Sequence, residues 1–122
     1  MAKRPKRIKK VPIPKLKAKA DTVFSLYIRH RDGWTCTICG SKARPQNGHY
    51  VKRSIMFVRF NEVNCNCICG PCNYRDNIHH HYYEKAIRLK WGNLKVDEML
   101  GTTSHPITNL RPLLEDVIRR YG

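Results

Sequence analysis

Acidic residues are scarce in this sequence. It has 9 Asp and Glu against 24 Lys and Arg, which gives a formal charge of +15 at pH 7 and a pI of about 10.0. No acidic residue precedes Asp21. This balance favours polyanionic partners, either nucleic acid or an anionic membrane surface, and carries little information about the fold.

Long apolar runs are also missing. A membrane-spanning helix needs about 20 consecutive apolar residues, and a secretory signal needs an apolar stretch of about 7 to 15. The N-terminus alternates Lys, Arg and Pro instead. We therefore expect no membrane association and a cytoplasmic protein, in which cysteines act as thiolate ligands or free thiols rather than as disulfides.

A chain of 122 residues has room for one small domain. Residues 1–20 contain three Pro and nine Lys and Arg, so we expect a flexible basic arm there, followed by a single domain over residues 21–122. The arm is either an electrostatic clamp on DNA phosphates or a solvated tail. Its candidate DNA-binding cations are Lys3, Arg4, Lys6, Arg7, Lys9 and Lys10.

Helical periodicity surrounds a central β-like region, which predicts an α+β fold. We expect the first helix to be capped by Asp21 and to end near Gly33, and the last to be capped by Thr108. The other expected helices cover residues 82–91 and 96–100, and the β-like runs cover residues 34–38, 49–52 and 57–60.

Four of the six cysteines form two C-x-x-C motifs separated by 29 residues. The motifs are Cys36 with Cys39, and Cys69 with Cys72. Two such turns close a tetrahedral four-thiolate Zn²⁺ site, which is structural because its saturated shell has no open position for substrate. Cys65 and Cys67 are the alternative ligands, and we expect them instead to be small buried residues or exposed free thiols.

Catalysis would require a second, harder cation with oxygen and nitrogen ligands. His49 lies between the two motifs, Asn64 lies before the second, and Asn73 directly follows Cys72. An imidazole with a pKa of about 6.5 can accept a proton from water that attacks a phosphodiester. His49 is therefore a candidate base, although a histidine considered alone is more often a packed residue.

The order of these residues resembles that of the HNH endonucleases, which have a ββα-metal fold. The closer resemblance is to NinG, the Rap recombination proteins of lambdoid phages, and it covers most of Asp21 to Gly122. It rests on segments 24–32, Cys36-x-x-Cys39-Gly40, 48–53, 59–64, Cys69-x-x-Cys72-Asn73 and 83–92.

The resemblance implies a phage endonuclease that cuts branched DNA, such as Holliday junctions and D-loops, in the bacterial host during recombination. It implies a zinc-stapled, treble-clef-like ββα-metal core with flanking helices, together with catalytic Mg²⁺ or Mn²⁺. His49 would be the general base, Asn64 would tie the hairpin loop, and Asn73 would bind the catalytic metal. The four C-x-x-C cysteines would bind zinc.

One expected metal ligand is missing. Many HNH enzymes have an Asp directly before the base, where this chain has Gly48. Asn77 lies one helical turn after Asn73 and could face the same ion, with His79 or Asp76 as other options. A surface or capping role for each of these residues is the alternative.

Several other side chains have two possible roles. Arg53 and Arg59 follow the base and could grip a phosphate with a bidentate fork, or Arg59 could pair with Glu62 and brace the loop. Tyr82 and Tyr83 could stack on an unpaired base, or they could pack the helix that contains them.

Two other functions remain open. One is a non-catalytic zinc-stapled DNA-binding protein, which Gly48 favours, and the other is a less selective HNH nicking endonuclease. Because symmetric resolution of a junction needs two paired cuts, we also expect a homodimer. The apolar face of helix 108–121 is either its interface or part of the core.

Overall fold

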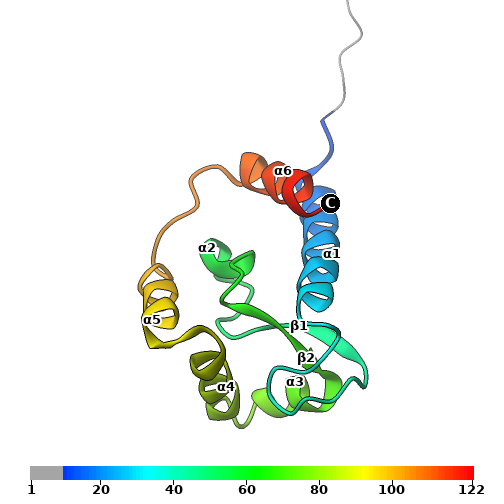
Figure 1. Cartoon of the computed structure of the whole chain (residues 1–122). Helices are drawn as coiled ribbons and strands as arrows, with labels where there is room; N and C mark the ends of the chain where they lie inside the picture. The colour runs from blue at the N-terminus through cyan, green and yellow to red at the C-terminus, as the bar shows by residue number, and fades with distance from the viewer. Residues whose placement is uncertain (1–9) are drawn as a thin grey trace, which may run out of the picture.

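The computed structural model describes residues 10–122, which form six helices and one two-stranded sheet (Figure 1). In chain order these are α1 (Ile13–Arg31), β1 (Pro45–His49), α2 (Met56–Arg59), β2 (Cys65–Cys69), α3 (Gly70–Asp76), α4 (His81–Trp91), α5 (Asn93–Gly101) and α6 (Leu110–Tyr121). This content confirms the predicted α+β class. The candidate arm residues Lys3, Arg4, Lys6, Arg7 and Lys9 lie outside the described residues.

Helix α1 begins at Ile13 rather than at Asp21, so part of the predicted arm is a packed helix. Leu16 and Ala20 are buried and extend the apolar stripe of Phe24 and Ile28 toward the N-terminus at a spacing of four residues. The expectation of an arm up to residue 20 overlooked this spacing. Lys10 precedes the helix and is exposed.

The two strands pair antiparallel in a register that runs from Pro45 opposite Cys69 to His49 opposite Cys65. All five residues of β2 are buried. Strand β2 was not predicted, because four of its five residues are Cys or Asn, and only Ile68 is of the β-branched or aromatic kind that marks strands. Strand β1 shares only His49 with the predicted run 49–52.

The other two β-like runs are not strands. Residues 34–38 enter a turn in which the Gly40 N–H donates to the Cys36 carbonyl oxygen over 2.9 Å. Residues 57–60 fall in and just after the short helix α2, which buries Val58 and Arg59. Runs this short do not carry enough periodicity to separate strand from helix or turn.

Helices α4 to α6 lie where helices were predicted, although α5 begins at Asn93, three residues before the predicted start at Val96. Helix α4 ends at Gly92, whose φ of 85° lies in the left-handed region that favours glycine. Helix α6 is preceded by Asn109 as its N-cap, in extended backbone with φ −144° and ψ 100°. The predicted cap at Thr108 was therefore one residue too early.

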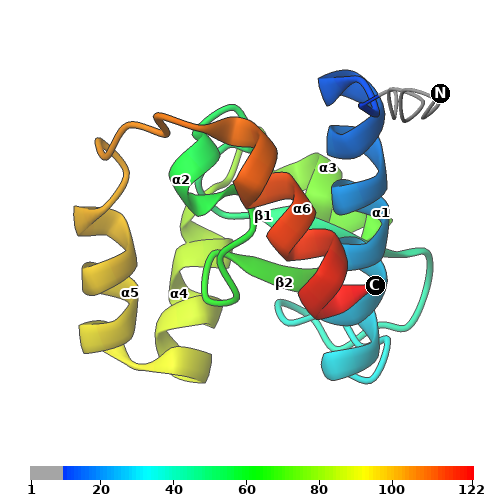
Figure 2. The same cartoon turned by 90° about the horizontal axis from the view of Figure 1, so that it is seen from above.

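The core has two parts. One cluster joins α1 to α6, where the rings of Phe24 and Tyr121 meet edge to face with centroids 4.9 Å apart. Figures 1 and 2 both place α6 alongside α1, so the apolar face of α6 that was a candidate dimer interface is covered within the chain. The second cluster lies under the strands and contains Ile68, Tyr83, Ile87 and Val96.

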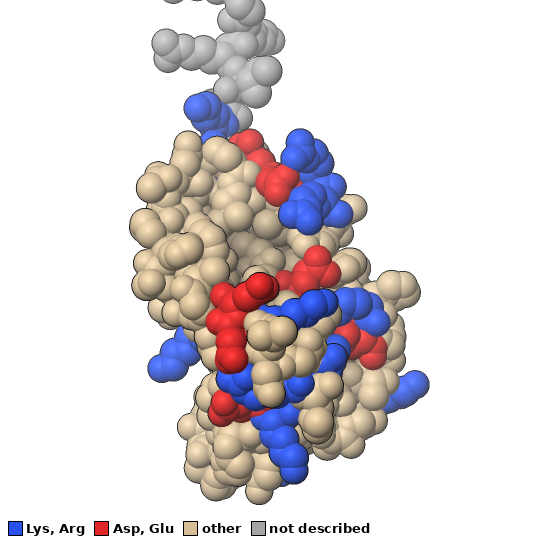
Figure 3. All heavy atoms as spheres, turned by 60° about the vertical axis from the view of Figure 1, so that its left-hand side comes forward, with Lys and Arg blue, Asp and Glu red and all other residues tan. Residues whose placement is uncertain are grey.

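The surface of the side on which α4 and α5 lie carries both signs of charge. Figure 3 brings this side forward and shows Asp and Glu side chains around a hollow, interspersed with Lys and Arg. The carboxylates around this hollow repel a polyanion such as DNA. Across residues 10–122, no helix combines the length and the apolarity needed to cross a bilayer.

Candidate zinc site and polar cleft

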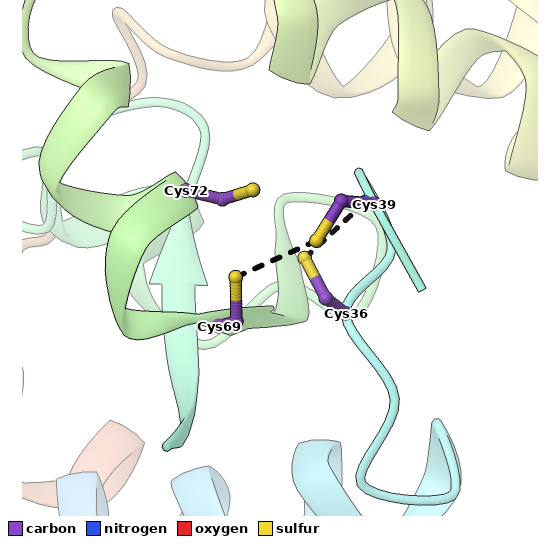
Figure 4. Close-up of side chains that lie close together, drawn as sticks. All are labelled: Cys36, Cys39, Cys69 and Cys72. Carbon is purple, nitrogen blue, oxygen red and sulfur yellow. Dashed lines mark hydrogen bonds between the residues drawn. The ribbon is translucent and has the colours of Figure 1, made fainter. Parts of the chain in front are cut away.

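The two C-x-x-C motifs converge on one point (Figure 4). Cys36 and Cys39 come from the loop after α1, whereas Cys69 ends β2 and Cys72 lies in the first turn of α3. Their four Sγ atoms lie within 4.8 Å of one another, and those of Cys39 and Cys69 are 3.6 Å apart. A tetrahedral zinc with Zn–S distances of about 2.3 Å separates its sulfur ligands by about 3.8 Å, so the four cysteines could hold this ion.

Backbone hydrogen bonds reach the sulfur atoms of the first C-x-x-C motif. The Cys39 N–H donates to Cys36 Sγ over 3.5 Å. A hydrogen bond from the Ser41 backbone lowers the pKa of Cys39 to about 7. Burial raises the pKa of the Cys69 and Cys72 thiols, so a bound cation is needed to stabilise their ionised form.

The remaining two cysteines are interior thiols. Cys65 and Cys67 are fully buried and reduced. Burial raises the pKa of both, and Cys65 Sγ donates to the Arg59 carbonyl oxygen over 3.3 Å. They are the small buried residues that the sequence predicted.

A polar cleft of about 870 Å³ lies between the end of β1, the loop after it, and α3. It is lined by Asn47, His49, Tyr50, Val51, Lys52, Arg53, Asn73, Asp76, Asn77, His80 and Leu100. Five residues named from the sequence, His49, Arg53, Asn73, Asp76 and Asn77, therefore meet in one cleft. His79 lies outside it, against a separate small pocket, and the adjacent His80 is in the cleft instead.

A backbone carbonyl fixes the tautomer of His49. Its Nε2 lies 2.9 Å from the Arg59 carbonyl oxygen, which can only accept a hydrogen bond. Nε2 therefore carries the hydrogen, and Nδ1 of the neutral ring has a free lone pair. Burial lowers the pKa of His49, as do the positive charges of Arg59 and Arg53.

Asn64 closes the loop that follows His49. Its side chain is fully buried. Oδ1 accepts from the Val51 N–H over 2.7 Å, and Nδ2 donates to the carbonyl oxygens of Val51 and Val58 over 3.1 and 3.0 Å. These bonds join the two ends of the loop from β1 to β2.

Arg59 is an interior residue rather than a surface cation. Its side chain is only 6% exposed and pairs with Asp21, with Nε 2.9 Å from Oδ1. It also donates to the Arg53 carbonyl oxygen over 2.9 Å. The alternative pairing with Glu62 was wrong, because Glu62 accepts from the hydroxyls of Tyr27 and Tyr121.

The cleft contains a hydrogen-bonded pair formed by His80 and Asp76, one of the optional metal ligands. His80 Nδ1 lies 2.8 Å from Asp76 Oδ1, and the His80 ring stacks on Tyr50 with centroids 4.3 Å apart and planes at 12°. Asn73 Nδ2 donates to Gln46 Oε1 over 2.7 Å. Across the described residues, no hydrogen bond to Asn73 Oδ1 is formed, so this oxygen is free to bind a ligand.

Tyr82 and Tyr83 differ in role. Tyr83 is fully buried, and its hydroxyl donates to the Gly48 carbonyl oxygen over 2.6 Å. Asn66 Nδ2 donates to the same hydroxyl over 3.2 Å. Tyr83 therefore packs the core beneath β1, whereas Tyr82 is 46% exposed.

Gly48 has no room for a side chain. A β-carbon at this position would lie 1.9 Å from Cδ1 and 2.2 Å from Cγ1 of Ile68, which is fully buried. An acidic metal ligand at position 48 is therefore incompatible with this packing.

We expect Gly48→Ala to reduce the free energy of unfolding by about 1–3 kcal/mol, because the new methyl group overpacks the core. Urea unfolding measures the change. Gly101→Ala is the matched control, since its β-carbon would meet nothing within 4 Å. Equal stability of the two variants would contradict the steric explanation.

The family comparison covers nearly the whole chain. A family model described as the bacteriophage lambda NinG protein matches residues 1–121. No curated protein and no solved structure matches the chain. On the strength of the family match, the chain belongs to the NinG family.

Proposed function

We propose that the chain is a metal-dependent HNH-type endonuclease that hydrolyses phosphodiesters in branched DNA during phage recombination. The observation that carries this proposal is the polar cleft in which His49, from β1, meets Asn73, from α3. The order of β1, β2 and α3 is the order of a ββα-metal core. Membership of the NinG family supports the phage role.

His49 is the general base. Its Nδ1 lone pair accepts the proton of the attacking water, while the hydrogen bond from Nε2–H to the Arg59 carbonyl oxygen holds the ring in place. That bond strengthens as the ring becomes positively charged, because a carbonyl oxygen stabilises an imidazolium donor. The pairing of Arg59 with Asp21 fixes the carbonyl in turn.

The donor groups of the cleft suit a hard divalent cation. Asn73 and Asn77 offer amide oxygens, Asp76 offers a carboxylate, and His80 offers a ring nitrogen. Mg²⁺ and Mn²⁺ favour oxygen ligands, and Mg²⁺ is often held by one or two carboxylates together with substrate phosphates. When bound, such an ion supplies neutralisation of the phosphate and the leaving oxygen. Asp76 replaces the carboxylate that Gly48 cannot provide, and His79 is not part of this set.

Basic residues at the rim of the cleft bind the DNA backbone. Lys52 and Arg53 are exposed and line the cleft beside His49. An Arg fork can hold two oxygens of one phosphate and orient it for attack. Arg59 does not take this role, because Asp21 already occupies its guanidinium.

The shifted pKa of His49 sets the pH dependence of cleavage. A base is active when neutral, and burial places the pKa of His49 below the ordinary value of 6.5. We therefore expect the acidic limb of the pH profile of kcat/KM to have its midpoint below 6.5. Arg53→Gln removes a nearby positive charge and should move this midpoint upward. A wild-type midpoint above 6.5 would contradict the assignment.

The basic arm strengthens binding without sequence specificity. Residues 1–9 contain five Lys and Arg, and each phosphate neutralised on duplex DNA adds about 0.9 to the salt slope of log K. We expect replacement of all five by Gln to reduce this slope by up to about 4.5 units. Fluorescence anisotropy between low and moderate salt measures it. Lys95→Gln, on α5, is the control. An unchanged salt slope in the arm variant would show that the arm does not contribute to DNA binding.

The proposal is tested by incubating the zinc-loaded chain with a four-way junction and with a linear duplex of the same sequence. Mg²⁺ or Mn²⁺ is added, and strand scission is followed on denaturing gels. Faster cleavage of the junction supports a branch-selective nuclease, and equal cleavage of both substrates supports the less selective nicking enzyme. A homodimer, measured by light scattering, would explain paired cuts.

A non-catalytic DNA-binding protein is the second candidate function. It is favoured by the packing of Ile68 against Gly48, which leaves no space for the usual acidic ligand. Salt-sensitive junction binding with no strand scission in any divalent metal would support this function and end the nuclease proposal.

A further inference from the structure

Two more hollows continue from the polar cleft along α3 and α4. Asp76 lines both the cleft and a small pocket that also touches His79 and Tyr82. Ile38 and Tyr82 line both that pocket and a groove of about 730 Å³. The groove is lined by Arg31, Asp32, Thr35, Cys36, Thr37, Ile38, Tyr82, Lys85, Ala86, Leu89 and Lys90. The shared residues place the three hollows next to one another, and we call this series, from His49 past Tyr82 and along α4, the path.

Aromatic and cationic groups surround the middle of this path. Tyr82 is 46% exposed, and its ring lies 4.2 Å from that of His81 and 6.0 Å from that of His79, centroid to centroid. The Arg75 guanidinium lies 5.7 Å from the centre of the Tyr82 ring. Such groups stack on the flat faces of nucleic-acid bases and tolerate any sequence.

Cations continue beyond Tyr82. Asp32 neutralises two of them, with Oδ1 2.9 Å from Arg31 Nε and 2.8 Å from Lys90 Nζ. Lys85 is exposed, and it forms no ion pair with any residue from 10 to 122. Thr37 adds a hydroxyl group, whose oxygen accepts a hydrogen bond from Lys90 Nζ and whose hydrogen can be donated. A phosphate backbone that passes Tyr82 therefore meets the Lys85 ammonium and a hydroxyl donor.

The zinc site supports this surface. Ile38 lies between the two cysteines of the first C-x-x-C motif, and Cys72 lines the same small pocket as Tyr82. Both belong to the segments that the four cysteines bring together. Tyr82 therefore lines this pocket beside the zinc site.

From this path we infer that the groove binds a single-stranded DNA arm where it leaves a branch point, with an unpaired base stacked on Tyr82. The inference rests on the proposed function and specifies its substrate. Bases inside a duplex are stacked on their neighbours and offer no free face, whereas an unpaired strand beside a branch does. The groove therefore favours D-loop-like or forked substrates over a four-way junction in which every base is paired.

Binding measurements on the full, zinc-loaded chain test this inference. His49→Ala is present throughout to prevent cleavage, and no Mg²⁺ or Mn²⁺ is added. The probes are a fork with an unpaired oligothymidine arm and a fully paired four-way junction. Tyr82→Ala is compared with Tyr82→Phe, which retains the ring, and with Tyr74→Ala, a more exposed tyrosine outside the three hollows.

We expect Tyr82→Ala to weaken binding of the fork by about 5- to 100-fold and to leave affinity for the paired junction unchanged. Tyr82→Phe and Tyr74→Ala should bind both probes like the parent chain. Lys85→Ala should reduce the salt slope for the fork by about 0.7. Circular dichroism and zinc content confirm that each variant is folded.

Two results would contradict the assignment of the groove as a single-strand binding site. One is an unchanged affinity of Tyr82→Ala for the fork, and the other is an equal loss of affinity for the fork and for the paired junction. These results differ from a failure of the nuclease proposal. If the chain with His49 intact cuts no DNA but its binding of the fork depends on Tyr82, the groove proposal stands and the nuclease proposal fails.

Discussion

Replacing His49 with alanine is expected to slow cleavage of branched DNA by about 10²- to 10⁴-fold and to leave DNA affinity nearly unchanged. The imidazole is the group in the cleft whose tautomer leaves a free lone pair on Nδ1. Alanine removes the proton acceptor but leaves the rim residues Lys52 and Arg53 in place. The measurement is the single-turnover rate on a junction with saturating protein.

A matched histidine separates catalysis from general effects of losing an imidazole. His30 is exposed on α1 and does not line the cleft, so His30→Ala should cleave at the wild-type rate. Thermal unfolding of His49→Ala checks that the lost hydrogen bond to Arg59 costs only about 1 kcal/mol. Equal cleavage rates for folded His49→Ala and His30→Ala would remove His49 from the mechanism.

Loss of zinc is expected to unfold the centre of the molecule. The four cysteines join the loop after α1 to β2 and α3. Helix α3 lines one side of the cleft, and β2 pairs with β1, whose end lines the other side. Structural zinc contributes about 10–16 kcal/mol in zinc-finger peptides, and the whole stability of a domain is about 5–15 kcal/mol. The zinc-free chain should therefore lose its cooperative thermal transition.

Cys69→Ala tests this dependence without a chelator. We expect it to bind no stoichiometric zinc, to lose the cooperative transition in circular dichroism and to lose cleavage with it. Cys65→Ala is the control, because Cys65 is equally buried but lies outside the cluster. It should retain one zinc per chain. A cooperative transition of wild-type size in zinc-free Cys69→Ala would show that the metal is not structural.

Local patterns in the sequence predicted the parts of the site that are encoded by spacing. The C-x-x-C motifs converge because each motif is a single turn whose two thiols point the same way. Their meeting also needs β2 and α3 to follow one another directly, which places Cys69 and Cys72 on either side of a strand-to-helix junction. His49 and Asn73 share a cleft because β1, which ends at His49, pairs with β2, and α3, which contains Asn73, follows β2 directly.

Contacts between distant residues were not predictable from the sequence. Arg59 pairs with Asp21, which is 38 positions away, so local spacing suggested Glu62 instead. The cleft position of His80 rather than His79 depends on the turn between α3 and α4. Consecutive side chains project in different directions there, and the sequence alone does not determine which one faces His49.

The spacing of hydrophobic residues located helices correctly wherever it was applied over the full length of the helix. It located α4, α5 and α6 closely, and it extends through Leu16 and Ala20 into the region assigned to the arm. The prediction of a flexible arm over residues 1–20 relied on the many Lys and Pro residues of this region and gave less weight to that spacing. Burial of the α1 stripe against α6 shows that a basic helix can be part of the core when its charges lie on the opposite face.

The most direct test of the central claim is anomalous diffraction from crystals of the zinc-loaded chain soaked in Mn²⁺. We expect a Zn²⁺ peak among Cys36, Cys39, Cys69 and Cys72, and a separate Mn²⁺ peak in the cleft beside Asn73 on the side of His49. Mn²⁺ bound only outside this cleft would contradict the assignment of the cleft as a nuclease centre.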